Sequence, residues 1–142
     1  MPDIRELPKG LKKFERAVYK KIANAQAVMG ATMVESVAKE TPQRSGRAAA
    51  NWSLSDKRDG GHDVGPLGRK EGWIYASTEA YNRVKYISRK TLRGSRLLPV
   101  YLLNKTPYIR PLDKFRGYFV RRNANRTYRK QLAILTKELS DL

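Results

Sequence analysis

Residues 41–52 read TPQRSGRAAANW, and they join two segments whose hydrophobic patterns differ. Pro42 cannot continue a helix, because it lacks an N–H group and its ring clashes with the preceding turn. Gly46 accepts a positive φ without steric cost, which is typical of a tight turn. A short helical turn over residues 47–50 and a strand that starts at Asn51 are then expected. The stretch therefore predicts a corner at which a helix gives way to a sheet.

A long helix is predicted before this corner, over residues 9–39. Its apolar residues recur at steps of three and four, which places them on one face of a helix. They are Leu11, Phe14, Val18, Ile22, Ala25, Met29, Met33 and Val37. A helix of this length is long for a chain of 142 residues. We expect it either to cross the whole body as a core-covering helix or to pack in part on another subunit.

The remaining pattern alternates between strand-like and helix-like segments. Thr78 is expected to cap a middle helix, and Gly94 to stop it. The sequence therefore predicts a single α+β domain, residues 1–142, whose small, mostly antiparallel sheet is flanked by a long N-terminal helix, a middle helix and a C-terminal helix. The expected segments are an arm over 1–8, strands over 51–55, 72–77 and 97–104, a flexible loop over 56–70, and helices over 79–92 and 118–139.

The charge is strongly positive and limits the classes of partner. The chain holds 30 Lys and Arg against 13 Asp and Glu, a formal net charge of +17. Such a charge favours a polyanion, whether nucleic acid, an acidic protein surface or an anionic membrane. No apolar run approaches the roughly 20 residues of a membrane span, so no membrane partner is expected. The absence of cysteine excludes disulfides and thiolate metal sites.

Enzymatic chemistry is not expected from this sequence. It contains no nucleophile elbow, phosphate-binding loop, dinucleotide fingerprint or pair of histidine ligands. Asp56, Asp59, His62 and Asp63 form a candidate hard-metal cluster, but their spacing matches no calcium loop. We therefore expect no catalytic residue, no metal and no cofactor. The loop is interpreted instead as one that projects toward a neighbouring subunit.

Two segments resemble small tail-completion or neck proteins of tailed bacteriophages. In that family a helix ends in a T-P-x-x-[ST]-G corner, and a later strand follows the pattern N-x-x-P-Y. Residues 41–52 resemble the first motif and residues 101–113 the second, although Asp113 replaces the usual Glu and Gly117 comes later than the usual Gly. The motif residues proposed as structural are Pro42, Gly46, Asn51, Asn104, Pro107 and Tyr108. Asn104 is expected in a turn and Tyr108 in the core.

The resemblance implies a structural virion protein without a cofactor. Its subunits would form a ring, with a hexamer favoured, between the head connector or adaptor and the tail tube or terminator. The implied location is the neck or tail of the virion, with the host cytoplasm as the site of assembly. The alternative is a sequence-independent nucleic-acid-binding protein, which would bind DNA or RNA as a monomer.

Clusters of basic residues are the candidate contact surfaces, both for a ring-forming virion subunit and for a nucleic-acid-binding protein. The basic helices are expected to face either an acidic ring or the double-stranded DNA in the lumen. No recognition-helix motif supports base readout. The candidate residues are Arg44, Arg47, Arg83, Lys85, Arg89, Lys90, Arg121, Arg122, Arg126, Arg129 and Lys130.

Overall fold

The α+β fold expected from the sequence is confirmed. The structure is a computed structural model, and it describes residues 7–42, 46–66, 71–93 and 96–142. Two small antiparallel sheets of two strands each are combined with a long N-terminal helix, middle helices and a long C-terminal helix. The elements are α1 (Leu7–Glu40), α2 (Arg47–Ala50), β1 (Trp52–Ser55), α3 (Glu71–Asn82), α4 (Val84–Thr91), β2 (Leu92–Arg93), β3 (Arg96–Leu97), β4 (Tyr101–Asn104), α5 (Ile109–Phe115) and α6 (Phe119–Ser140).

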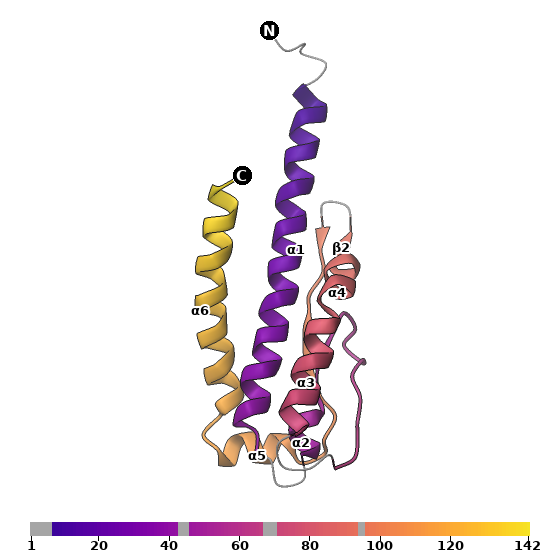
Figure 1. The fold of residues 1–142 in the computed structure, drawn as a ribbon, viewed down its shortest axis with the longest axis vertical. Coiled ribbons are helices and arrows are strands. Elements are labelled where there is room, and N and C mark those ends of the chain that lie inside the picture. Colours follow the sequence, from indigo (N-terminus) through magenta and orange to yellow (C-terminus); the bar gives the residue numbers. More distant parts are fainter. Residues whose placement is uncertain (1–6, 43–45, 67–70, 94–95) are drawn as a thin grey trace.

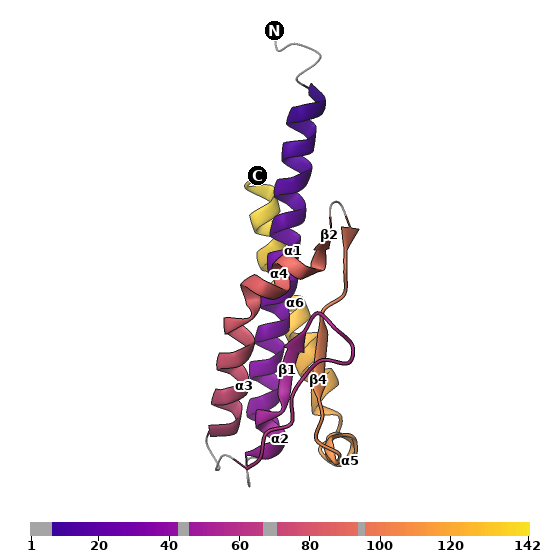
Figure 2. The ribbon, with the colours of Figure 1, turned by 90° about the vertical axis from the view of Figure 1, so that its right-hand side faces the viewer.

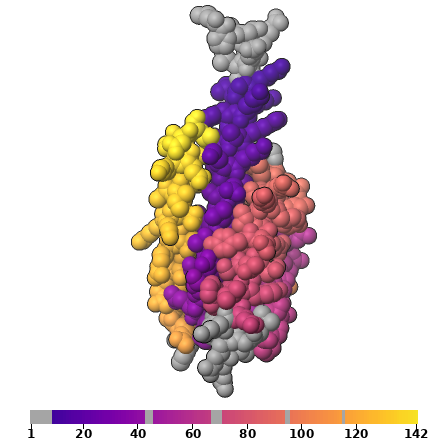
Figure 3. Space-filling view, viewed as in Figure 1, coloured from indigo at the N-terminus to yellow at the C-terminus, as the bar shows by residue number. Residues whose placement is uncertain are grey.

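Helix α1 is the axis of the molecule, and its N-terminal end extends beyond the other elements. Figure 1 shows α6 along one side of α1 and α3 with α4 along the other, while Figure 2 shows β1 and β4 on a further side. At about 1.5 Å per residue, the 34 residues of α1 span about 50 Å. The first turns of the helix stand clear of the body in every view (Figure 3).

The buried face of α1 is lined by alanine and valine and is not the face predicted from the large apolar residues. The fully buried residues on this helix are Ala23, Ala27, Ala31, Val34, Val37 and Ala38. Of the predicted stripe, only Val37 is among them, while Leu11 and Phe14 are exposed. Helix α3 contributes its own small residues Ala76 and Ala80 to the same core cluster, and both are buried. Small side chains on both helices allow a close approach, and that approach decides which face is covered.

Residues 72–77 lie in α3, so the prediction of a strand here is wrong. Trp73, Ile74 and Tyr75 favour strands by propensity, but the packing of the small-residue face against α1 overrides that preference. Thr78 consequently lies inside α3 rather than capping a helix. The break comes at Arg83, whose N–H is shared by the carbonyls of Glu79 and Ala80, and α4 follows.

The sheet pairs strands that are distant in the sequence. Strand β1 pairs with β4 in antiparallel register, with Trp52 opposite Asn104 and Ser55 opposite Tyr101. Trp52 and Leu54 belong to the core, together with Phe119 of α6 and Ile87 of α4. The predicted strand over 97–104 is divided, since β3 ends at Leu97 and β4 begins at Tyr101. Strands β2 and β3 form a separate antiparallel pair, and Gly94, the predicted helix stop, lies outside the described residues.

The strand that the resemblance implies over the second motif ends at Asn104. Residues 109–115 instead form α5, in which Pro111 occupies the first turn, where its missing N–H has no intrahelical partner to lose. Tyr108 precedes this helix and is 43% exposed, so its assignment to the core is wrong. The C-terminal helix predicted over 118–139 is confirmed as α6.

Candidate functional site

The end of α1 is fastened to the beginning of β1 by one hydroxyl group. Helix α1 ends at Glu40, two residues before Pro42, as the proline predicts. The Thr41 hydroxyl donates to the carbonyl oxygen of Val37 at 2.6 Å and accepts a hydrogen bond from Trp52 Nε1 at 2.9 Å. Thr41 and Trp52 are both buried. The two ends of the corner predicted over residues 41–52 are therefore joined directly, while residues 43–45 lie outside the described residues.

Gly46 has the left-handed backbone that the sequence predicts, with φ 74°. Its carbonyl oxygen accepts the N–H of Ala50 at 2.9 Å, which closes the single turn of α2. Gly72, at the start of α3, lies so close that a Cβ atom there would collide with the Gly46 backbone. Two glycines therefore allow the corner and α3 to touch.

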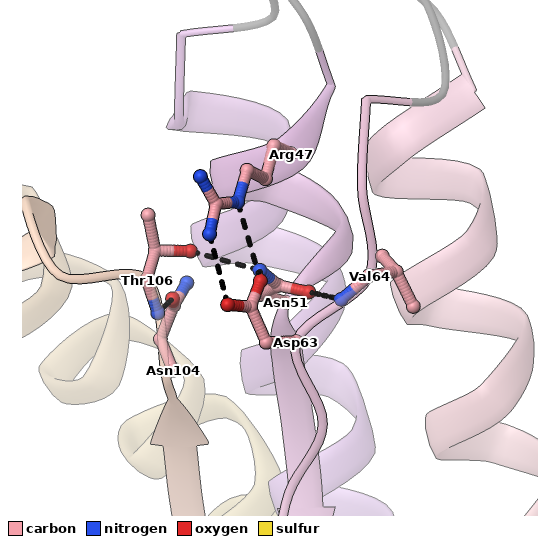
Figure 4. A network of polar contacts seen from close by, with 6 residues as sticks. All are labelled: Arg47, Asn51, Asp63, Val64, Asn104 and Thr106. Carbon is pink, nitrogen blue, oxygen red and sulfur yellow. Dashed lines mark hydrogen bonds and ion pairs between the residues drawn. The ribbon is translucent and has the colours of Figure 1, made fainter.

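Asn51 is the centre of a polar network that connects three segments (Figure 4). The side chain is completely buried. Its amide nitrogen donates to Asp63 Oδ1 at 2.6 Å and to Thr106 Oγ1 at 3.0 Å, and its amide oxygen accepts the N–H of Val64 at 2.6 Å. Asp63 and Val64, in the loop that follows β1, thereby lie against the corner.

Asn104 attaches the second motif to the first. Its side-chain nitrogen donates to the carbonyl oxygen of Ala48 at 2.8 Å, and its side-chain oxygen accepts the N–H of Thr106 at 2.9 Å. Because Asn104 also pairs with Trp52 across the sheet, the two segments that carry the family resemblance meet at one place. Pro107 and Tyr108, the other residues of the second motif, are exposed beside it.

Arg47 is held within the corner by Asp63. Two hydrogen bonds join them, from Arg47 Nη2 to Asp63 Oδ2 at 2.9 Å and from Arg47 Nε to Asp63 Oδ1 at 3.2 Å. These bonds from Arg47, together with the one from Asn51, hold the pKa of the Asp63 carboxyl group below its usual range. Arg47, predicted as a partner contact, therefore has an intramolecular role, and Arg44 lies outside the described residues.

The candidate metal cluster is not assembled. His62 Nε2 lies 2.8 Å from the carbonyl oxygen of Ala50, and the imidazole ring meets the Tyr75 ring edge-on at 5.6 Å. Both carboxylate oxygens of Asp63 accept hydrogen bonds, Oδ2 from Arg47 and Oδ1 from Asn51. Among the residues that the structure describes, no three metal-ligating side chains come together. His62 and Asp63 instead contact residues of the corner.

The basic residues of the middle helices surround an exposed tyrosine. Arg83 and Lys90 stack on the ring of Tyr86, at 5.6 Å and 5.5 Å from its centroid. Tyr86 is 46% exposed, and Lys85 and Arg89 are exposed on the same short helix. These four predicted contact residues thus belong to α4 and the residue before it.

A second basic group lies on α6 and surrounds a depression, which we call the basic hollow. This open depression has a volume of about 690 Å³. Arg122 forms an ion pair with Glu40 at 3.4 Å, while Arg121 is exposed but does not line the hollow. The lining residues are Arg122, Asn125, Arg126, Arg129 and Lys130.

An apolar surface remains partly uncovered along α1. Leu11 is 66% and Phe14 56% exposed on the projecting end, while Val18, Ile22 and Met29 further along are half-buried. Lower on the helix, Met29 and Met33 border a small cavity of about 210 Å³ with Leu54, Val100 and Leu102. This surface holds the predicted stripe apart from Val37, which is buried, and we call it the α1 stripe.

Sequence reasoning missed Thr106 and the structural role of Asp63. An Asn two residues before a Thr is a signal for a side-chain-to-backbone turn, and Asn104 forms that turn with the N–H of Thr106. The bond between Asn51 and Thr106 has no local signal, because it depends on the pairing of β1 with β4.

Comparison of the chain with protein-family models, with curated proteins and with solved structures gave no match. Within the described ranges, the helices all lack the combination of length and apolar character that a membrane span requires.

Proposed function

We propose that the chain is a structural subunit of the neck or tail of a tailed bacteriophage. In this proposal, copies of the chain form a ring that joins the head connector to the tail around the DNA channel. The ring is assembled in the host cytoplasm and remains in the virion. The resemblance of residues 41–52 and 101–113 to tail-completion proteins supplies the family, and a hexamer is the favoured assembly.

The observation that carries the proposal is the projecting end of α1. Every side chain of residues 9–16 is exposed, and Leu11 and Phe14 are the most exposed large apolar residues among those that the structure describes. A helix end that packs on nothing is marginal in water, since most helical stability in proteins comes from tertiary packing. An exposed apolar surface at such an end favours contact with another protein.

The hydrogen-bond network of the corner also supports this proposal, because it gives the subunit a fixed shape. The side-chain polar atoms of buried Asn51 and half-buried Asn104 form hydrogen bonds within the chain, and such a network specifies one arrangement of the backbone. A ring that closes by heterologous contacts needs subunits of fixed shape, because small angular differences accumulate around the ring.

Electron microscopy of the purified full chain tests the proposal. We expect closed rings from the protein alone or after addition of purified connector or tail proteins. Particles that remain single chains in all of these samples would contradict it.

A second candidate function is a sequence-independent nucleic-acid-binding protein. The net charge of +17 and the basic hollow favour it. It predicts tight, strongly salt-dependent binding by the monomer. The size of the particle in solution therefore separates the two candidates better than DNA binding does.

A further inference from the structure

We propose that the basic hollow on α6 binds the phosphate backbone of double-stranded DNA without reading its sequence. The inference deepens the proposed function, because it names the part of the subunit that meets the DNA. It also applies to an isolated chain, so it can be tested independently of ring formation.

Three of the four cations that line the hollow have no charge partner among the described residues. Arg122 is paired with Glu40, but Arg126, Arg129 and Lys130 have no hydrogen bond or ion pair within the part of the chain that the structure describes. Three unpaired cations within two turns of one helix repel one another, and a bound polyanion relieves that repulsion.

The arrangement of the cations follows the helix axis. Steps of four and three from Arg122 to Arg126 to Arg129 place these side chains on one face, about 6 Å and 4.5 Å apart along the axis. The result is a row of charges and not a single anion pocket, so it fits a chain of phosphates. Arginine forks bind phosphate oxygens in pairs, and the Asn125 amide adds a further donor.

The lining of the hollow favours duplex DNA over other acidic partners. Among the residues that the structure describes, no aromatic and no large aliphatic residue lines it. Sites for single strands use aromatic side chains as stacking platforms, and protein interfaces have an apolar core inside a polar rim. A surface of arginine, lysine and asparagine alone is suited to a backbone that offers only oxygens.

The sequence of α6 does not support base readout. Helix α6 lies along α1 (Figure 1), and its residues Phe119, Asn123 and Thr127 are buried in the protein. The exposed side of the helix carries the row of cations, and the sequence contains no recognition-helix motif that would place it in the major groove. Contacts from that side reach phosphates, which carry no direct sequence information.

The test measures binding of the full chain to short fluorescent duplexes of two unrelated sequences, between about 50 and 200 mM salt. We expect equal affinity for both sequences. The double variant Arg126→Gln/Arg129→Gln should bind roughly tenfold more weakly, and the slope of log K against log salt should become shallower by about 2. Arg122 is left unchanged, because its ion pair with Glu40 also has a structural role.

The matched control is Lys57→Gln/Arg58→Gln, in the loop after β1. Both residues are exposed, so this variant removes the same net charge at a different surface. We expect it to change the affinity by no more than about twofold, with an unchanged slope. Unchanged thermal unfolding of both double variants shows that each has kept the fold.

Three results would overturn the inference. They are equal losses in the two double variants, no loss in Arg126→Gln/Arg129→Gln, and competition by polyglutamate or single-stranded DNA as effective as that by duplex DNA. Sedimentation of the same samples tests the proposed function separately. If the protein is a monomer that binds DNA through the hollow, only the proposed ring is refuted. If it forms a ring whose DNA binding does not depend on Arg126 and Arg129, only the role of the hollow is refuted.

Discussion

Asn51 and Thr106 are separated by 55 positions in the sequence and are joined by a hydrogen bond of 3.0 Å between buried side chains. The bond connects the corner after α1 to the residues that follow β4. The same amide also holds Asp63 and Val64 of the intervening loop. One buried side chain therefore determines how three segments are placed relative to one another.

Replacement of Asn51 by alanine should lower the free energy of unfolding by about 3 kcal/mol. The variant loses three hydrogen bonds and leaves the Thr106 hydroxyl and the Val64 N–H without their partner. Urea denaturation of the two proteins measures the difference. Asn82→Ala, at the exposed end of α3, is the control and should change stability by less than about 0.5 kcal/mol. Equal effects at the two sites would show that the network has no special role.

Replacement of Gly46 by alanine should cost about 1–2 kcal/mol, because the left-handed backbone at φ 74° brings Cβ close to the carbonyl oxygen. Valine should cost more, since its branched side chain adapts less well to this backbone. Thermal unfolding measures both variants. Gly10→Ala is the control of opposite sign, because Gly10 lies in α1 with open space around it, and it should stabilise by about 0.5–1 kcal/mol. A Gly46→Ala protein as stable as the wild type would refute the turn assignment.

The ion pair between Arg47 and Asp63 predicts a pH dependence of stability. The pKa of Asp63 is lowered in the folded chain, so its contribution is complete above its unfolded value of about 3.9 and is lost as the pH falls through the folded value. The Asp63→Asn protein lacks this titrating group, so its stability should fall less than that of the wild type as the pH is lowered. The measurement is the melting temperature of both proteins between neutral pH and acid. Parallel curves for the two proteins would mean that Asp63 does not contribute.

Replacement of Leu11 and Phe14 by serine should separate folding from assembly. Both side chains are more than half exposed, so the unfolding free energy of the monomer should change by less than about 1 kcal/mol. Assembly should be lost, because the α1 stripe no longer offers an apolar surface at the projecting end. Sedimentation velocity measures assembly, and Ile74→Ser, which changes an exposed residue of α3, is the control. Normal assembly of the Leu11→Ser/Phe14→Ser protein would exclude this end of α1 as the interface.

The sequence predicts local features of this fold well. Pro42 marks the end of α1, Gly46 adopts the predicted positive φ, and the helical periodicity of α1 and α6 locates both helices within a few residues. Each of these features depends on steric or periodic properties of a few neighbouring residues. Such properties can be seen without knowing the tertiary structure.

Features that depend on distant contacts were predicted less well. The buried face of α1 consists of alanines, whose weak hydrophobicity gives a fainter pattern than Leu11, Phe14 or Met29. Residues 72–77, in the first part of α3, are predicted as a strand because their aromatic residues hide a four-residue spacing of Gly72, Ala76 and Ala80. That spacing acquires meaning only beside the matching spacing on α1. The contact between Asn51 and Thr106 likewise requires the register of β1 with β4.

The mass of the particle that the purified full chain forms in solution tests the central claim most directly. One chain has a mass of 16.3 kDa, so sedimentation or native mass spectrometry over a range of protein concentrations resolves the number of copies. An assembling subunit predicts a discrete species of several copies, with six favoured, which Leu11→Ser/Phe14→Ser reduces to single chains. A chain that remains a monomer at every concentration, with and without connector and tail proteins, would contradict the account.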